Sequence, residues 1–131
     1  MAVSYPEDQD HERLRVLIID DESAVTSLLT RILRAMDVTV VRDGASAIEA
    51  LAGGRWDAVI CDLALPDTSG PTLYHRATDA QRERFLFITG GAMTADAQRF
   101  LDLCAAPVLY KPFDASAIRR AVAAVTQKSR A

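Results

Sequence analysis

The chain has 131 residues, half of them hydrophobic and a quarter charged, a balance typical of one globular domain. A net charge of −3 argues against a surface for nucleic-acid phosphates, and no apolar run approaches the roughly 20 residues that span a bilayer. No secretory signal is recognisable, and the two cysteines lack metal-type spacing. We therefore expect a cytoplasmic protein that contacts neither nucleic acid nor membrane directly.

The polar residues 1–13 show no periodicity and are expected to form a flexible N-terminal arm. One domain is predicted over residues 14–127, followed by a short C-terminal tail at 128–131. No repeat, low-complexity segment or internal linker divides this domain.

The first half of the domain alternates predicted strands and helices. An apolar run at 15–19 predicts a strand covered on both faces, and a stripe at helical spacing predicts a helix after Ser23. Further strands are predicted at 38–41 and 57–61, with a helix at 45–52 between them. The stripe of the first helix consists of Val25, Leu28, Leu29, Ile32, Leu33 and Met36.

The second half continues the alternation. A helix opens at Gly70, a strand follows at 85–88, and Thr94 is placed to cap the next helix. The last strand is predicted at 107–110, and Asp114 is placed to cap the final helix. Strands that alternate with helices across short loops predict an α/β fold, with a parallel sheet covered by helices on both faces.

Polar side chains follow four of the five predicted strands. They are Asp20 and Asp21 after the first strand, Asp62 after the third, Thr89 after the fourth and Lys111 after the fifth. Taken singly, each has an ordinary alternative role, such as helix capping by an acid or a solvated lysine. Because the carboxyl ends of parallel strands lie at one edge of a sheet, the set together predicts a site at that edge.

Three carboxylates at one edge need a compensating charge. Two unit charges about 4 Å apart repel by roughly 4 kcal/mol at an effective dielectric near 20. A hard divalent cation relieves this repulsion, and an all-oxygen, partly hydrated site suits Mg²⁺. With a metal, an ammonium and a hydroxyl beside it, Asp62 is placed to act as the nucleophile of phosphoryl transfer and to form an acyl phosphate.

These motifs match a known family. The segments Val16–Glu22, Asp62–Gly70, Ile88–Gly91 and Lys111–Phe113 occur in the order and spacing of the receiver domain of bacterial two-component response regulators, which the chain resembles over residues 14–126. The resemblance implies a flavodoxin-like, doubly wound (βα)5 sandwich, in which the parallel five-stranded sheet has the order 2-1-3-4-5.

The resemblance also implies a function. A histidine kinase or a histidine phosphotransfer protein would phosphorylate Asp62 from a phosphohistidine. The domain would catalyse its own phosphorylation and dephosphorylation without being a metabolic enzyme. Asp20, Asp21, Asp62 and the backbone carbonyl of Ala64 would hold Mg²⁺.

Other implied features lie around the phosphoryl group and on the surface. Thr89 and Lys111 would contact the phosphoryl oxygens, and the peptide bond from Lys111 to Pro112 is expected to be cis. A downstream protein target would bind the face made by the fourth helix, fifth strand and fifth helix, and homodimerisation through that face is a candidate output. Kinase docking is expected near Ser23, Ala24 and Ser27 of the first helix.

The chain departs from the family pattern in one important place. The position that usually carries the switch aromatic, three residues before the lysine, holds Val108, and Tyr110 does not replace it. Signalling is then expected through ordering of the loop after Thr89 or through shifts of the fourth helix. The small residues Ala64 and Gly91 lie where the family controls access of water, so the sequence does not assign a phosphoryl lifetime.

Several alternatives were weighed. A flavodoxin would need a phosphate-cradling loop where Asp20, Asp21 and Glu22 stand, and a haloacid-dehalogenase-type phosphatase would need a second Asp at the position of Ala64. Two alternatives stay open, namely a receiver module of a hybrid sensor kinase and a phosphorylation-independent interaction module. No DNA-binding domain is recognisable after the last helix, so direct control of transcription by this chain alone is not expected.

Overall fold

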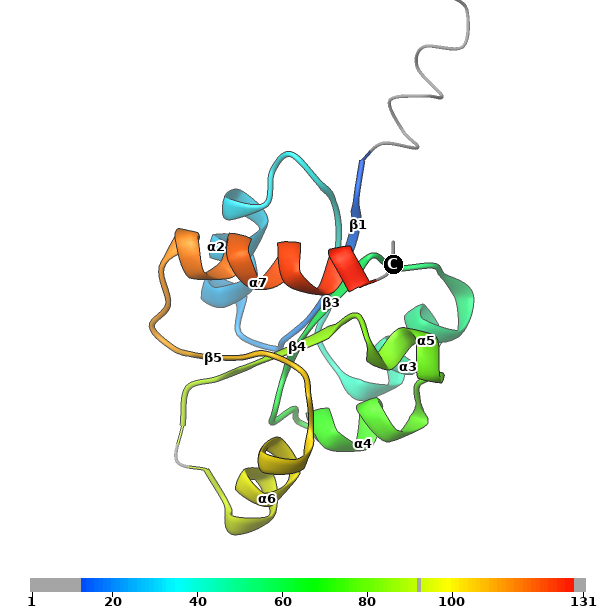
Figure 1. The fold of residues 1–131 in the computed structure, drawn as a ribbon, viewed down its shortest axis with the longest axis vertical. Coiled ribbons are helices and arrows are strands. Elements are labelled where there is room, and N and C mark those ends of the chain that lie inside the picture. Colours follow the sequence, from blue (N-terminus) through cyan, green and yellow to red (C-terminus); the bar gives the residue numbers. More distant parts are fainter. Residues whose placement is uncertain (1–12, 92, 129–131) are drawn as a thin grey trace, which may run out of the picture.

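The computed structural model describes residues 13–91 and 93–128, which fold into one parallel sheet between two layers of helices (Figure 1). The predicted arm at 1–13 and the predicted tail at 128–131 lie almost wholly outside the described residues. Within the described part of the chain, no helix is long and apolar enough to cross a membrane.

All five predicted strands are present. Their bounds are β1 (Arg15–Ile19), β2 (Asp37–Val41), β3 (Ala58–Asp62), β4 (Phe85–Thr89) and β5 (Val108–Tyr110). The order across the sheet is β2-β1-β3-β4-β5 and every neighbouring pair is parallel, which confirms the predicted topology. Asp62 and Thr89 are the last residues of their strands, so the sheet itself fixes their backbones at the carboxyl edge.

The described helices number six, one more than predicted. They are α2 (Ser23–Ile32), α3 (Gly44–Gly53), α4 (Gly70–Arg76), α5 (Asp79–Arg82), α6 (Ala95–Leu103) and α7 (Ala115–Lys128). The additional helix, α5, is a single turn closed by a capping box between Thr78 and Gln81. The Thr-x-x-Gln spacing was a usable signal for it, but the short segment has no buried face.

The predicted caps of the last two long helices are confirmed. The backbone N–H of Ala97 donates to Thr94 Oγ1 at 3.0 Å, and that of Ala117 donates to Asp114 Oδ1 at 2.7 Å. Each bond satisfies a backbone donor that the first helical turn leaves without a partner.

Two apolar cores lie on opposite faces of the sheet (Figure 1). One is aliphatic and joins the sheet to α2 and α7, through fully buried side chains such as Ile18, Leu29 and Ile118. The other joins the sheet to α3, α4 and α6 and is rich in aromatic side chains: Trp56, Tyr74, Phe85, Phe87 and Phe100. Both cores hold strand residues in place up to the edge that carries the polar side chains.

One detail of the predicted core is wrong. Leu28, expected on the buried stripe of α2, is 39% exposed, and Thr26 is buried at 2% exposure. The hydroxyl of Thr26 donates to the carbonyl of Ser23 at 3.2 Å, so its polar atom is satisfied within the helix. Leu28 instead lines a groove beside the carboxyl edge.

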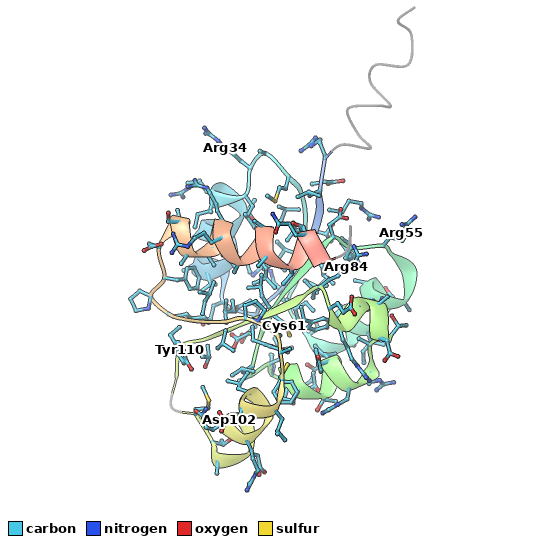
Figure 2. The ribbon with its side chains drawn as sticks, viewed as in Figure 1. Arg34, Arg55, Cys61, Arg84, Asp102 and Tyr110 are labelled. Atoms are coloured by element: carbon cyan, nitrogen blue, oxygen red, sulfur yellow. The ribbon has the colours of Figure 1, made fainter. Side chains whose placement is uncertain are left out.

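The thiol of Cys61 and the indole of Trp56 are buried, whereas the imidazole of His75 is exposed. Cys61 is a free, buried thiol near the centre of the molecule (Figure 2), and burial raises its pKa above the ordinary value. Trp56 packs in the core, and its indole N–H donates to the carbonyl of Ala50 at 3.0 Å. His75 is exposed, and its ring packs edge-on against Phe100. His11 lies outside the described residues.

Candidate functional site

The carboxyl edge of the sheet brings the predicted polar residues together. Carboxylate oxygens of Asp20, Asp21 and Asp62 all lie within 4.8 Å of one another. Asp20 is fully buried and Asp62 is 7% exposed, whereas Asp21 is exposed at the mouth of the site. Thr89, at the end of the neighbouring strand, is 6% exposed. The arrangement comes directly from the parallel order of β1, β3 and β4, which end side by side.

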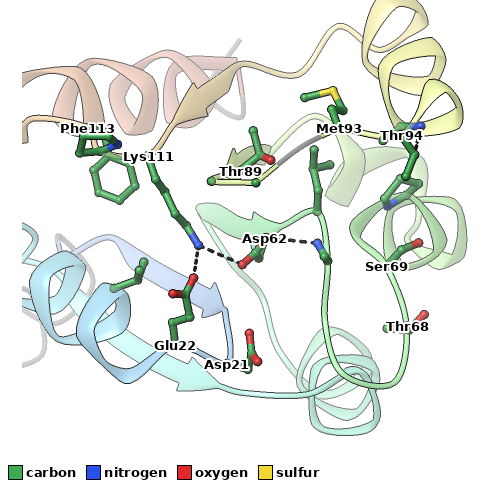
Figure 3. Close-up of a pocket in the computed structure, with 18 of the residues that line it drawn as sticks. Asp21, Glu22, Asp62, Thr68, Ser69, Thr89, Met93, Thr94, Lys111 and Phe113 are labelled. Carbon is green, nitrogen blue, oxygen red and sulfur yellow. Dashed lines mark hydrogen bonds and ion pairs between the residues drawn. The ribbon is translucent and has the colours of Figure 1, made fainter.

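Lys111 reaches into this group of acids from the end of β5 (Figure 3). Its Nζ lies 3.1 Å from Asp62 Oδ2, 3.3 Å from Asp20 Oδ2 and 2.6 Å from Glu22 Oε1. Burial lowers the pKa of Lys111, but its hydrogen bonds to Glu22 and Asp62 and the nearby negative charges outweigh burial and raise that pKa above the ordinary value. The site therefore holds a permanent cation.

The backbone around Lys111 fixes the direction of its side chain. Its N–H donates to the carbonyl of Thr89 at 2.7 Å, and its peptide bond to Pro112 is cis, as the resemblance implied. Gly90 lies against the stem, because a Cβ at that position would stand 2.7 Å from Lys111 Cδ. The glycine therefore leaves room for the lysine to cross the sheet edge.

Asp20 is the most constrained of the acids. Its Oδ1 accepts from the backbone N–H of Glu22 at 2.8 Å, whereas Oδ2 has no hydrogen bond among the described residues and faces only the ammonium of Lys111, at 3.3 Å. Burial raises the pKa of Asp20 to about 6; the charge of Asp62 adds to this, and Lys111 and the bond from Glu22 oppose it. The site thus contains a buried carboxylate whose Oδ2 is held by an ion pair and by no hydrogen bond among the described residues.

These donors fit a hard divalent cation. Mg²⁺ prefers carboxylate, carbonyl and water oxygens, and here three carboxylates converge, among them the buried carboxylate of Asp20. Lys111 supplies one positive charge against four acids, counting Glu22. A divalent cation would offset the excess negative charge that remains.

The loop after β3 is folded back tightly beneath Asp62. The N–H of Ala64 donates to Asp62 Oδ1 at 3.2 Å, and the N–H of Gly70 donates to the carbonyl of Leu63 at 2.8 Å. A Cβ on Gly70 would stand 2.8 Å from the carbonyl oxygen of Asp62 and 3.1 Å from the ring of Phe87. Only a residue without a side chain fits at this close approach.

The sequence reasoning did not assign roles to two acids of the site region. Glu22 makes the shortest contact to Lys111, although it was considered only for its charge. The carboxylate of Asp67 accepts from the N–H groups of Gly44 and Ala45 at 2.7 and 3.2 Å, and so ties the loop after β3 to the start of α3. Glu22 directly follows the acidic pair, which was a usable signal; no sequence signal pointed to the contact of Asp67.

A groove opens over these residues, between the first turns of α2 and α6 (Figure 3). Its lining includes the charged side chains of Asp21, Asp62 and Lys111 and the apolar side chains of Leu28 and Met93. A reacting group on another molecule can therefore reach Asp62 from solvent.

The family model of the response regulator receiver domain matches residues 16–123. This chain belongs to that family. The match spans every strand and most of α7, so the receiver domain accounts for nearly all of the described structure.

Curated relatives agree with this assignment. The transcriptional regulatory protein TcrA of Mycobacterium tuberculosis is 35% identical over 107 residues, which cover 77% of this chain and 41% of TcrA. DltR of Streptococcus agalactiae is 29% identical over 119 residues, which cover 88% of this chain and 53% of DltR. The matched region thus spans about half of the length of each relative.

Solved structures share the fold. A CheY-like receiver domain protein from Methanospirillum hungatei superposes with a TM-score of 0.80 at 20% identity, over 91% of this chain and 98% of that one. The receiver domain of a sensor histidine kinase from Pseudomonas aeruginosa, solved with a magnesium ion in its active-site cleft, gives a TM-score of 0.73 at 24% identity, over 88% and 98% of the two chains. The predicted flavodoxin-like architecture is confirmed.

Proposed function

We propose that this receiver domain is a phosphorylation switch in which Asp62 accepts a phosphoryl group from a phosphohistidine on a histidine kinase or a histidine phosphotransfer protein. The observation that carries the proposal is the contact of Lys111 Nζ with Asp62 Oδ2 at 3.1 Å, in a site that also gathers Asp20 and Asp21. An oxygen of Asp62 would form a bond to phosphorus while the bond from phosphorus to the imidazole nitrogen breaks. The imidazole leaves with that electron pair and gains a proton.

The residues around Asp62 would act mainly by charge and position. Lys111 is already paired with the carboxylate and would contact a phosphoryl oxygen, and Thr89, at the end of the neighbouring strand, would contact another. The groove above Asp62 admits the donor side chain. We expect docking of the kinase on α2 near Ser23, Ala24 and Ser27, and Ala24 lines this groove. Unchanged transfer rates after surface substitutions there would contradict this expectation.

Asp20, Asp21, Asp62 and the carbonyl of Ala64 would hold Mg²⁺. The convergence of three carboxylates, with Oδ2 of buried Asp20 held only by its ion pair to Lys111 among the described residues, supports this assignment. When bound, the ion would neutralise charge on the phosphoryl oxygens. The chain's own part is to supply oxygen ligands on strand ends that the sheet keeps rigid.

Output would run through the face of α6, β5 and α7 to a downstream protein, with homodimerisation as one form of it. Position 108 carries Val, so the signal would pass through α6 itself. The loop from Thr89 leads to Thr94, which caps α6, and Leu101, 9% exposed, is the one buried residue of that helix. Phe100 packs on Phe87 at a ring distance of 5.4 Å. A helix held by so few buried side chains can shift at small cost.

The test is a titration with Mg²⁺ and beryllofluoride, a phosphoryl analogue, read by amide NMR shifts. Trp56 fluorescence is a poor readout, since Trp56 precedes Asp62 by six positions in the chain, a distance of about 20 Å at roughly 3.3 Å for each step along an extended strand. Saturable shifts that need both ligands, extend into α6 and vanish in Asp62→Asn would support the proposal. A folded protein without any response would point instead to a phosphorylation-independent interaction module.

Light scattering on the same samples tests the form of the output. An unchanged mass with and without beryllofluoride would count against dimerisation. The cytoplasmic location and the absence of direct contact with nucleic acid remain predictions. The relatives DltR and TcrA are both named as transcriptional regulators, and each is about twice as long as the region matched here.

A further inference from the structure

The shortest ionic contact of the site involves an acid that none of the roles above uses. Lys111 Nζ lies 2.6 Å from Glu22 Oε1, closer than its 3.1 Å contact to Asp62 and its 3.3 Å contact to Asp20. The Glu22 side chain is 58% exposed, so it approaches Lys111 from the solvent side of the site. In Figure 3 the ammonium group lies between Glu22 and Asp62.

The backbone of Glu22 has a separate task. Glu22 is the N-cap residue of α2, and its carbonyl accepts from the N–H groups of Val25 and Thr26 at 3.1 Å. Its side chain makes no capping hydrogen bond, although N-cap side chains commonly do. The carboxylate is therefore directed to Lys111 rather than to the helix, and it can move without loosening α2.

A phosphoryl group on Asp62 changes the charges that Lys111 faces. It adds close to two negative charges and three strong acceptor oxygens beside Nζ. An ammonium has three donors, and here three carboxylates surround it. At least one must give way to a phosphoryl oxygen. Asp20 is buried and Asp62 carries the phosphoryl group, so the exposed carboxylate of Glu22 is the one free to leave.

We infer that Glu22 is a positioning residue that holds Lys111 in the unphosphorylated state and must release it when the phosphoryl group arrives, and so weakens phosphoryl uptake. The inference rests on the proposed function of Asp62. It assigns to Glu22 a role distinct from metal binding, since the converging carboxylates are those of Asp20, Asp21 and Asp62.

Two substitutions separate the contact from the charge. Glu22→Gln removes the charge, whereas Glu22→Asp keeps it, shortens the side chain by one methylene and favours capping of α2 over contact with Lys111. Glu49→Gln, which removes an exposed carboxylate on α3, is the matched control. Affinity for beryllofluoride is measured at saturating Mg²⁺, and the side-chain NMR signals of Lys111 are recorded without ligand.

Both Glu22 variants are expected to bind beryllofluoride about two- to fivefold more tightly than the wild type, the range of one partly exposed ion pair. Both should shift the Lys111 signals, and Glu49→Gln should change neither quantity. Wild-type affinity in Glu22→Asp with tighter binding in Glu22→Gln would overturn the inference, because general charge would then explain the effect. Unchanged affinity in both would overturn it too.

A failure of the proposed function would give a different result. Neither the wild type nor any variant would then bind beryllofluoride, and Asp62→Asn would behave like the wild type. This result would contradict both phosphorylation of Asp62 and the release of Lys111 by Glu22. Shifted Lys111 signals would then still show that Glu22 holds the lysine. Unshifted signals in a protein that does bind beryllofluoride would overturn the inference about Glu22 alone.

Discussion

The interior of the sheet and its carboxyl edge are built by the same strands but differ in how well their groups are satisfied. In β1, Val16 to Ile19 are fully buried among apolar side chains. The next residue, Asp20, is equally buried, yet one of its carboxylate oxygens has no hydrogen-bond partner among the described residues. Within one step along the chain, apolar side chains whose burial stabilises the fold give way to a buried carboxylate that destabilises it.

The two regions therefore contribute to the free energy of unfolding in opposite directions. Close-packed apolar side chains gain free energy from burial, about 25 cal/mol per Å² removed from water. Clustered acids lose free energy through desolvation and mutual repulsion until a cation arrives. Substitutions in the two regions should therefore change the free energy of unfolding with opposite signs in metal-free protein.

The largest effect is expected inside the aliphatic core. Leu29→Ala should lower the free energy of unfolding by about 2–5 kcal/mol, because Leu29 is fully buried and its removal leaves a cavity. Leu28→Ala is the matched control, since the neighbouring side chain is 39% exposed and should lose much less. Urea denaturation measures both, and equal losses would contradict the assigned burial of α2.

The next effect lies where interior and edge meet. Gly70→Ala should destabilise the protein by about 1–3 kcal/mol, because the new Cβ would stand 2.8 Å from the carbonyl oxygen of Asp62, a backbone atom that moves only with the strand. Gly53→Ala is the control, as nothing lies within 4 Å of a Cβ there. Thermal melts compare the two, and a stable Gly70→Ala variant would mean that the loop after β3 adapts easily.

The edge itself should respond with the opposite sign. Asp20→Asn should raise the free energy of unfolding at pH 7 without metal by about 1–2 kcal/mol, since it removes a buried charge whose pKa is raised to about 6. The full shift would correspond to about 3 kcal/mol, which water at the mouth of the site reduces. The variant should also lose stabilisation by Mg²⁺. If metal-free Asp20→Asn is less stable than the wild type, the idea that the buried acid destabilises the fold is wrong.

The pH dependence of this gain checks its cause. In the folded, metal-free wild type, Asp20 stays protonated to about pH 6, whereas in the unfolded chain its pKa returns to 3.8. The folded state then binds more protons between these values, so wild-type stability should fall as pH rises through this window. Asp20→Asn should lack this component, and its advantage over the wild type should disappear near pH 4.

The smallest effect is expected at the exposed acid. Asp21→Asn should raise the melting temperature of metal-free protein by less than Asp20→Asn does, because solvent screens the charge of Asp21. Stabilisation by Mg²⁺ should be lost, since Asp21 is one of the three converging carboxylates. An equal or lower melting temperature, measured by calorimetry in EDTA, would mean that Asp21 does not repel its neighbours.

Much of the fold could be predicted from local sequence. Apolar runs of four or five residues and the stripes between them predicted all five strands and five of the six described helices. The parallel order then required the polar residues at positions 20, 21, 62, 89 and 111 to meet at one edge, as they do. Such patterns are local because the periodicity of apolar residues within a single strand or helix indicates which of its faces is buried.

Tertiary structure decided what depends on distant neighbours. It turned Leu28 toward the groove, directed Glu22 to Lys111, 89 residues away in the chain, and placed Asp67 against the start of α3. Side-chain partners of this kind follow from how whole elements pack, which no periodicity encodes. The sequence by itself therefore determined the fold and the polar residues at the carboxyl edge of the sheet. Packing of the elements decided which carboxylates contact Lys111.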